Sequence, residues 1–431
     1  MTVGAGEASS GVQPGAARPL RVVATALGLY AIVIALLVYV LGYSGIWYGF
    51  HDNSDVGLYF QYAGEMARGR RPYVDFLLEY PPLAVPWFAW PGHTDDLVGY
   101  RLFFNVQMFT VLAVAALLTA VAGAHLWPGR RAQWVAVAFA AAVAANGAIS
   151  ANRYDATVAL VLAGMFAAVA VRSWPAAAML VGAGFALKIV PAILLPLVLV
   201  LAGRARAIAW CGLAFSVAAF TPFVPLVTHG AAGLEHLVRY HLERPLQVES
   251  SLATALMIGH LAGWGPLEIR NGYGGQVIAG SARLATLSGI LGLVALAATY
   301  AVIWWRREVL RRTPQLVPIA AVAVLLAFVT FAKVLSPQYL VWLLPAAALV
   351  APEHRGLAAA LLLTMLLTQI EFPGRYPDLV SLRTGTVLLV TARNGLLAVA
   401  FLASLLALAR PRRTFMSPQR RRSLDPRPNS T

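Results

Sequence analysis

Residues 314–340 read PQLVPIAAVAVLLAFVTFAKVLSPQYL, and this stretch decides the fold class. No charged residue occurs before Lys333, so the apolar part is long enough to cross the ~30 Å hydrocarbon core of a bilayer as a helix. Its apolarity is continuous and does not alternate, which is typical of a membrane helix and not of a strand in a membrane barrel. We therefore predict a transmembrane helix over residues 314–333.

The whole chain has the composition of a membrane protein. Of its 431 residues, 59% are hydrophobic and 12% are charged, and the mean hydropathy is +0.71. A soluble domain carries about 25% charged residues, so this chain cannot cover a globular surface with polar groups. We predict an all-α polytopic membrane protein with a single bundle of about 12 (10–12) transmembrane helices over residues 18–409. The apolar runs that form these helices lie at about 22–43, 98–123, 133–150, 155–171, 175–187, 189–202, 207–228, 283–304, 314–333, 338–351, 356–371 and 384–409.

Arginines orient the predicted bundle, because positively charged loops stay on the cytoplasmic side. With the N-terminus inside, 19 of the 33 basic residues and only 4 of the 18 acidic residues fall on that side, and the difference of +15 equals the whole net charge. We expect disordered cytoplasmic ends at 1–17 and 410–431. The basic excess thus indicates contact with anionic lipid, and nucleic-acid binding has no support.

Two predicted outer loops, 44–97 and 229–282, are unusually long, and loops of this length are usually functional. Helical patches at 54–68 and 233–242 indicate that both loops lie on the outer membrane surface. The inner loops are only a few residues long and leave little room for a cytoplasmic active site. We therefore expect the chemistry on the outer side.

Asp55 stands at the start of the first predicted outer helix. If Ser54 or the residue before it caps this helix, Asp55 falls in the first turn, with Tyr59 and Tyr62 on the same face. The positive helix end keeps such a carboxylate ionised, and an ionised carboxylate beside aromatic rings can act as a general base. The alternative is that Asp52 and Asp55 only cap the helix and hold the loop.

Lysines are rare in this chain and therefore informative. Only Lys188 and Lys333 are lysines, and each lies at the end of an apolar run and shortly before Pro191 or Pro337. A cation at membrane depth is costly and indicates a functional site, and the prolines interrupt the helices there. Each lysine could bind an anion such as a lipid phosphate; the alternative is that it reaches the interface or pairs with a carboxylate such as Asp155.

Residues 152–155 predict a tight outer turn between two helices. Its Arg153 and Asp155 either pair with each other or contribute to the side of the membrane on which Asp55 lies. Residues 271–275 predict a flexible loop and no nucleotide-binding fingerprint, since no strand precedes them.

The sequence carries no metal or cofactor signature. Cys211 is the single cysteine, which excludes an intramolecular disulfide and every cysteine-based metal site. The histidines are scattered and do not occur with carboxylates at ligand spacing. We therefore expect neither a metal nor a cofactor.

Six sequence blocks occur in a fixed order along the chain. They are Ser54-Asp55 to Tyr59, Arg71-Pro72-Tyr73 with Glu79-Tyr80-Pro81-Pro82, Asn152-Arg153-Tyr154-Asp155, Lys188-Ile189-Val190-Pro191, Arg244 to Ser251, and Lys333 to Tyr339. Together they resemble glycosyltransferase family 87, the polyprenyl-phosphate-mannose-dependent α-mannosyltransferases of actinobacteria, which have the GT-C fold. The resemblance covers about residues 22–409, and a composition rich in arginine and poor in lysine suits a GC-rich actinobacterium.

This resemblance implies many transmembrane helices around an outward-facing cavity, a lipid-linked sugar donor, and transfer with inversion at the sugar carbon. It also implies an aspartate of the first outer loop as general base, which maps to Asp55, with Asp52 as its one rival. The acceptor stays open among phosphatidylinositol mannosides, lipomannan-type glycans and other envelope glycolipids. The expected partners are thus a polyprenyl-phosphate sugar donor, a glycolipid or glycan acceptor and the bilayer of the plasma membrane.

We therefore expect a direct displacement, in which Asp55 takes the proton of an acceptor hydroxyl and the polyprenyl phosphate leaves. Lys333, Arg153 or Lys188 would stabilise the charge of the leaving phosphate. Tyr59, Tyr62 and Tyr339 are expected to stack on the sugars or to hydrogen-bond them. The further candidate substrate contacts are Glu79, Tyr80, Arg244, Glu249 and Gln338, although Glu79 with Tyr80 also suits a rigid turn.

Other function classes remain open from the sequence. A transporter or lipid flippase is one, because broken helices with buried cations also build transport sites. A non-catalytic envelope scaffold leaves the two membrane lysines unexplained. Within the enzyme class the donor could carry a pentose or glucose, since a pattern of charges and helices does not distinguish sugars.

Overall fold

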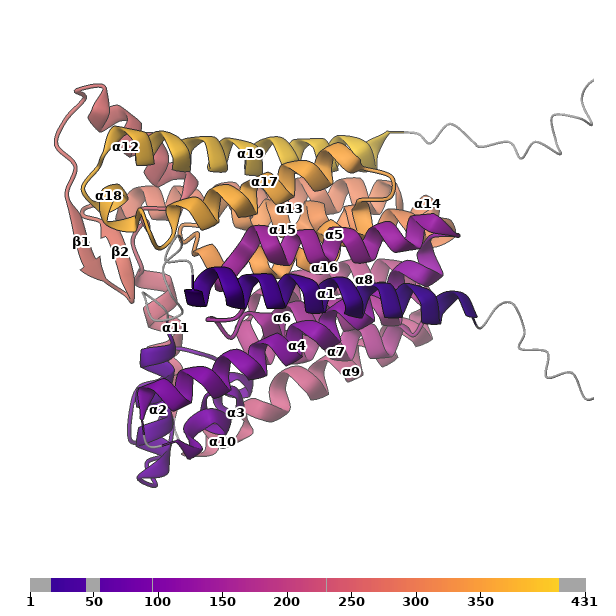
Figure 1. Cartoon of the computed structure of the whole chain (residues 1–431), viewed down its shortest axis with the longest axis horizontal. Coiled ribbons are helices and arrows are strands. Elements are labelled where there is room, and N and C mark those ends of the chain that lie inside the picture. The colour runs from indigo at the N-terminus through magenta and orange to yellow at the C-terminus, as the bar shows by residue number, and fades with distance from the viewer. Residues whose placement is uncertain (1–16, 44–54, 95, 230, 411–431) are drawn as a thin grey trace, which may run out of the picture.

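Helices make up most of the computed structural model, which describes residues 17–43, 55–94, 96–229 and 231–410 (Figure 1). The longer helices are α1 (Ala17–Tyr43), α4 (Leu97–Leu126), α5 (Arg130–Asn146), α6 (Ala156–Ala170), α7 (Trp174–Lys188), α9 (Ala205–Phe220), α13 (Ala282–Trp305), α15 (Val317–Phe331), α17 (Arg355–Glu371) and α19 (Thr384–Ala409). The shorter helices are α2 (Val56–Ala67), α3 (Val85–Ala89), α8 (Leu195–Ala202), α10 (Val224–His229), α11 (Ala231–Glu243), α12 (Ser251–Leu261), α14 (Arg307–Arg312), α16 (Leu344–Val350) and α18 (Tyr376–Val380).

Short 3-10 helices and one hairpin complete the described elements. The 3-10 helices are η1 (Pro82–Ala84), η2 (Trp90–His93), η3 (Gly147–Ser150), η4 (Val190–Leu194), η5 (Thr221–Phe223), η6 (Pro314–Leu316) and η7 (Pro337–Leu343). The strands are β1 (Ile269–Gly272) and β2 (Gly275–Ile278), which pair antiparallel.

Six helices of the described chain are long and apolar enough to cross a membrane. They span Leu97–Leu126, Arg130–Ser150, Ala205–Thr228, Ala282–Trp305, Pro314–Phe331 and Thr384–Ala409. Several other predicted spans correspond to shorter apolar helices, so the all-α membrane class agrees with the structure while the count of about 12 crossings stays a prediction.

The helices divide into a buried centre and an apolar outer ring. All residues of 316–327 in α15 and the turn before it are buried, whereas α9 and α13 expose large apolar side chains such as Leu213 (53%) and Leu293 (69%). A water-soluble bundle turns its apolar side chains inward, so exposed apolar faces of this extent indicate contact with lipid. The protein is therefore a multi-pass membrane protein.

Two helices break where the sequence carries its lysines. Helix α7 ends at Lys188, and the chain continues through Ile189, whose φ is +51°, into η4 and α8. Helix α15 ends at Phe331, and the chain resumes a helical path only at Pro337 in η7. The prolines after each lysine remove backbone donors and prevent a continuous helix, so polar backbone and cations meet at both breaks.

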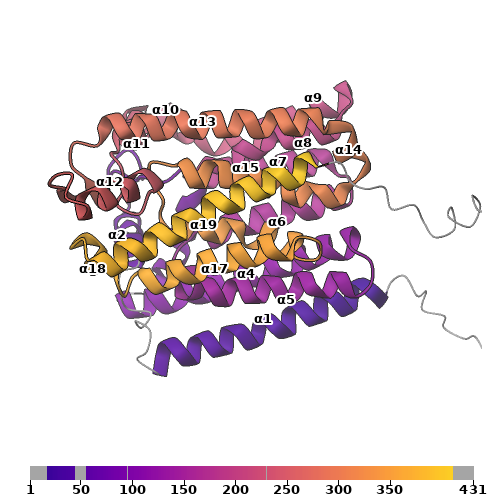
Figure 2. The ribbon, with the colours of Figure 1, turned by 90° about the horizontal axis from the view of Figure 1, so that it is seen from above.

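The small elements gather at one end of the bundle, which we call the cap end. In Figure 1 and Figure 2, α2, α10, α11, α12 and α18 lie at one end, and α14 lies at the other. The hairpin turn at Tyr273 and Gly274 has positive φ at both residues (54° and 67°), as a tight two-residue turn between twisted strands requires. The predicted flexible loop at 271–275 is therefore wrong: it is the turn of a β-hairpin.

A segment that we call the strap, residues 244–250, joins this hairpin to the bundle. The Val248 N–H donates to the carbonyl of Gln276, and the Ile278 N–H donates to the carbonyl of Leu246 (3.0 and 2.9 Å). The strap thus lies beside β2 and pairs with it through the backbone, as a third strand would. Leu246 and Val248 are fully buried in a small apolar core between the hairpin, α12 and α19.

Close packing between α7 and α9 depends on Gly182, and this gives a first prediction. A Cβ atom on Gly182 would lie 2.5 Å from the backbone oxygen of Phe215, whereas a Cβ atom on Gly212 of α9 meets nothing within 4 Å. We expect Gly182→Ala to force the helices apart and to cost about 1–3 kcal/mol, measured as a lower unfolding temperature in detergent. The matched Gly212→Ala change should leave that temperature unchanged or raise it slightly. Equal behaviour of the two variants would show that this contact is not tight.

Candidate active site

Asp55 lies at the cap end of the bundle and precedes the first turn of α2. It occupies the N-cap position, but its side chain makes no capping hydrogen bond and is 31% exposed. The predicted helix start is thus wrong by one or two residues, since Asp55 stands before the first turn and not within it. The rival Asp52 lies outside the described residues.

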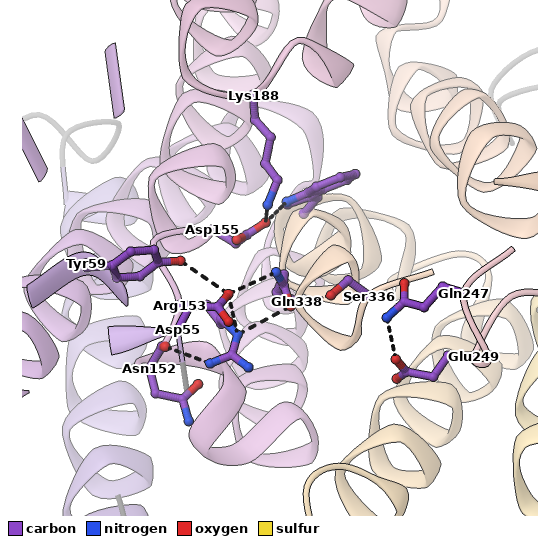
Figure 3. Close-up of polar contacts among 11 residues, drawn as sticks. Asp55, Tyr59, Asn152, Arg153, Asp155, Lys188, Gln247, Glu249, Ser336 and Gln338 are labelled. Carbon is purple, nitrogen blue, oxygen red and sulfur yellow. Dashed lines mark hydrogen bonds and ion pairs between the residues drawn. The ribbon is translucent and has the colours of Figure 1, made fainter. Parts of the chain in front are cut away.

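Three side chains converge on one oxygen of Asp55 (Figure 3). The Arg153 Nε lies 3.2 Å from Oδ2 of Asp55, and the Tyr59 hydroxyl and the Gln338 Nε2 each lie 3.5 Å from the same atom. The other oxygen, Oδ1, accepts no hydrogen bond from any residue that the structure describes. The carboxylate is thus held from one side, while its partly exposed side can meet a substrate.

Arg153 is almost completely buried, with 4% of its side chain exposed. Its Nε also reaches Oε1 of Gln338 at 3.4 Å, its Nη1 donates to the Asn152 carbonyl at 3.2 Å, and its guanidinium lies 5.5 Å from the ring of Phe372. A buried guanidinium needs a compensating charge, and Asp55 supplies it. The two charges of the 152–155 turn therefore do not pair with each other, which excludes that alternative.

Asp155 pairs with Lys188 instead. The Lys188 Nζ lies 2.6 Å from Oδ1 of Asp155, and the indole N–H of Trp342 donates to the same oxygen at 2.7 Å. Rings of Tyr154, Tyr339 and Trp342 surround the ammonium group at 4.9 to 5.5 Å. Of the two interpretations of Lys188, the structure supports the pair with Asp155, because its charge is already compensated.

Tyr59 belongs to an aromatic cluster beneath Asp55. Its ring is fully buried and stacks on Phe88 at 4.3 Å, with Tyr80 and Tyr154 packed edge-on at 5.8 and 6.0 Å. Tyr62 is also buried (8% exposed). The ring of Tyr59 thus packs against protein and not against a sugar, and its hydroxyl is the part that faces Asp55.

A second polar group surrounds Glu79 at the cap end. The Tyr240 hydroxyl and the Glu79 carboxyl both lie close to Gly274, where a Cβ atom would be 3.1 Å from the hydroxyl and 3.7 Å from Oε1 of Glu79. Burial raises the pKa of Glu79, while the nearby Tyr240 hydroxyl and the charge of Arg244 oppose this rise. The hairpin turn therefore covers a partly buried carboxyl group, and its glycine allows the close approach.

Lys333 and Arg244 form a pair of like charges. The Lys333 Nζ donates to the carbonyl of Leu242 at 2.7 Å. Burial and the charge of Arg244 both lower the pKa of Lys333. Within the described chain, no carboxylate lies at ion-pair distance from either cation, and the nearby Glu79 carboxyl interacts with Arg244 only at longer range.

Other expected contacts are distributed around these groups. Gln247 donates to Glu249 at 2.7 Å, and Glu249 is fully buried, so its access to a substrate is restricted. Tyr339 stacks on Trp342 at 4.2 Å. Sequence reasoning missed Trp342, whose only signal is its place three residues after Tyr339 in the lysine-containing block. No group of three or more His, Cys, Asp or Glu side chains that could hold a metal occurs among the residues described.

Residues 76–337 match the family model of glycosyltransferase family 87. This match covers more than half of the chain. The chain belongs to glycosyltransferase family 87. No curated protein matches the chain.

Membership of family 87 makes this protein a membrane glycosyltransferase. Such an enzyme acts on a lipid-linked sugar donor and on an acceptor at the bilayer. The matched segment contains Arg153, Lys188, Arg244 and Lys333, whereas Asp55 precedes it. The position of Asp55 against Arg153 therefore comes from the structure alone.

The buried pair of Lys188 and Asp155 gives a second prediction. Lys188→Met leaves a fully buried carboxylate without its cation, so we expect a loss of about 3–5 kcal/mol and a clearly lower unfolding temperature in detergent. Adding Asp155→Asn removes the unpaired charge and keeps an acceptor for Trp342, so the double variant should recover much of the loss. If the double variant is as unstable as the sum of the single variants, the two groups do not interact.

Proposed function

We propose that this protein transfers mannose from a polyprenyl-phosphate donor to a glycolipid or glycan acceptor outside the cytoplasm, with Asp55 as the general base. The observation that carries this proposal is a partly exposed carboxylate ion-paired with the buried Arg153 in a family 87 glycosyltransferase. The pair supports an ionised and oriented carboxylate. General-base catalysis needs both properties.

The reaction is a single displacement at the sugar carbon. A proton passes from the acceptor hydroxyl to Asp55, the hydroxyl oxygen bonds to the anomeric carbon, and the bond from that carbon to the phosphate oxygen breaks. The electron pair of that bond leaves with the polyprenyl phosphate. Attack and departure occur on opposite faces of the carbon, so the configuration inverts.

Because attack and departure occur on opposite faces of the sugar carbon, the candidate cations divide into those near the attacking hydroxyl and those near the leaving phosphate. Arg153 binds Asp55 directly and therefore belongs to the side of the attacking hydroxyl, and Lys188 is neutralised by Asp155. Lys333 and Arg244 have no carboxylate partner among the described residues and best suit the leaving phosphate. A site that stabilises developing negative charge with preorganised cations gains most of its catalysis from them.

Glu79 and Tyr240 suit contacts to sugar hydroxyls. They lie near Arg244 and beneath the hairpin turn, and a carboxyl with a phenol provides both donors and acceptors. Lipid flipping without covalent change is the rival function, and it leaves the pairing of Asp55 unexplained. Mass spectrometry of envelope glycolipids from a deletion strain separates the two: a truncated glycan supports the transferase and identifies the acceptor, and accumulation of an unmodified lipid supports the flippase.

Asp55→Asn provides the direct test of the base. The amide keeps the size of the side chain but does not accept the proton, so kcat should fall roughly 10²- to 10⁴-fold in transfer of radiolabelled mannose from polyprenyl-phosphate-mannose by purified protein. Asp75→Asn is the matched control, because Asp75 lies on the same outer segment and pairs only with the exposed Arg71. It should keep wild-type kcat. Full activity of Asp55→Asn, with loss in Asp52→Asn, would transfer the role to Asp52.

Neutralising the two uncompensated cations tests the phosphate assignment. Lys333→Gln and Arg244→Gln should each lower kcat/KM for the donor by roughly 10²-fold, because each removes a charge that stabilises the leaving group. Arg270→Gln changes an exposed arginine of β1 that pairs with Glu268, and it should have no effect. Wild-type kcat/KM in both cation variants contradicts the assignment.

A further inference from the structure

The strap is bound to the helix bundle through its backbone. The Gln247 N–H donates to the Lys333 carbonyl at 3.0 Å, and the Val248 N–H donates to the Gln276 carbonyl at 3.0 Å. Arg244 lies at the start of this segment. The strap, which carries Arg244, is thus hydrogen-bonded directly to the backbone of Lys333. The position of the strap therefore sets the spacing of these two cations.

The far end of the strap is held by helix α19. The Arg393 Nη2 donates to the Glu249 carbonyl at 2.8 Å, and the Asn394 Nδ2 donates to the same oxygen at 3.1 Å. Asn394 also donates to the Thr254 hydroxyl at 2.7 Å, which ties the first turn of α12 to the same point. One carbonyl oxygen therefore receives two side-chain donors from consecutive residues of a membrane helix.

Arg393 is unusual for its location. It lies within the apolar helix α19, only 1% of it is exposed, and its charge acts on the buried carboxyls of Glu249 and Glu371. Burial together with the charge of Glu371 raises the pKa of Glu249, and the charge of Arg393 opposes this rise.

A charged group in a membrane helix is costly, and stability alone favours an apolar replacement. The Nε and Nη1 of Arg393 have no hydrogen-bond partner among the described residues, so the group is not a fully satisfied structural network. Its one direct hydrogen bond to the protein backbone goes to the strap. This direction points to a role in placing the strap.

We propose that Arg393 and Asn394 are positioning residues that fix the strap through the Glu249 carbonyl and thereby set the spacing of Arg244 and Lys333 for an anionic phosphate. The inference rests on the proposed function in that these two cations bind the donor phosphate. It adds two residues of α19 that would act through the strap and not through contact with the substrate. The spacing of two cations affects the bound donor and the transition state alike, so the effect should appear mainly in donor affinity.

The experiment compares Arg393→Lys and Asn394→Ala with wild type in the full-length protein in detergent. Lysine keeps the buried positive charge but lacks the planar fork of donors, so the variant can fold without the same hold on the strap. Arg383→Gln is the control, because Arg383 precedes the same helix, is 72% exposed and pairs only with Asp378. Two measurements are made: hydrogen exchange of the peptide 244–250, and the Kd of farnesyl phosphate as the anionic probe.

We expect faster exchange in the peptide 244–250 and a Kd raised about 5- to 10-fold in both variants, the loss that one ordinary hydrogen bond accounts for. KM for the donor should rise by a similar factor while kcat changes less, and the control should match wild type. Unchanged exchange in the strap overturns the proposal. Faster exchange with an unchanged Kd also overturns it, since the strap then does not set the phosphate site.

Failure of the proposed function gives a different pattern. If the wild type binds farnesyl phosphate but transfers no sugar, while the two variants still bind it more weakly, the anchoring role holds and the transferase mechanism fails. If Lys333→Gln and Arg244→Gln bind the probe as wild type does, the phosphate is not at these cations, and the positioning role falls with it.

Discussion

The ion pair between Lys188 and Asp155 brings together the parts on which the site depends. Asp155 precedes α6, Lys188 ends α7, and the indole of Trp342 in η7 donates to the same carboxylate oxygen. Two helix breaks and one helix start therefore meet at a single buried anion. Because an isolated buried carboxylate is very unfavourable, this meeting point is strongly specified. Arg153 lies two residues earlier in the same turn, and its side chain takes the other direction, toward Asp55.

Such a division of charges could be predicted only in part from the sequence. The apolar runs, the helix breaks at the two lysines and the position of Asp55 at a helix start all depend on local patterns, and these patterns are clear. The choice of partners is not local. Arg153 is one residue away from Tyr154 and two from Asp155, yet it pairs with Asp55 nearly one hundred positions earlier. Sequence distance favours the wrong pair, and only the packing of α2 against the bundle decides between them.

Two further features of the structure could not be predicted from the sequence. Residues 271–275 have the composition of a flexible loop, but the strap supplies hydrogen-bond partners to β2, and this tertiary pairing turns a weak local tendency into a hairpin. Arg393 was missed although the reasoning applied to the lysines also fits it: a cation lies in the middle of an apolar run. Because nearly all cations of this chain are arginines, the rarity of lysine does not single out an arginine that also lies in an apolar helix.

The charges at the cap end therefore fall into two kinds with different energetic consequences. Lys188 and Arg153 are compensated, so they stabilise the fold and orient a carboxylate but have little charge left for a ligand. Lys333 and Arg244 have like charges, and burial together with the charge of Arg244 lowers the pKa of Lys333. A protein that only had to be stable could offset these charges with one carboxylate, and the described chain carries none at ion-pair distance. On the proposed mechanism the donor phosphate supplies the missing negative charge, so this pair of cations would favour both its binding and its departure.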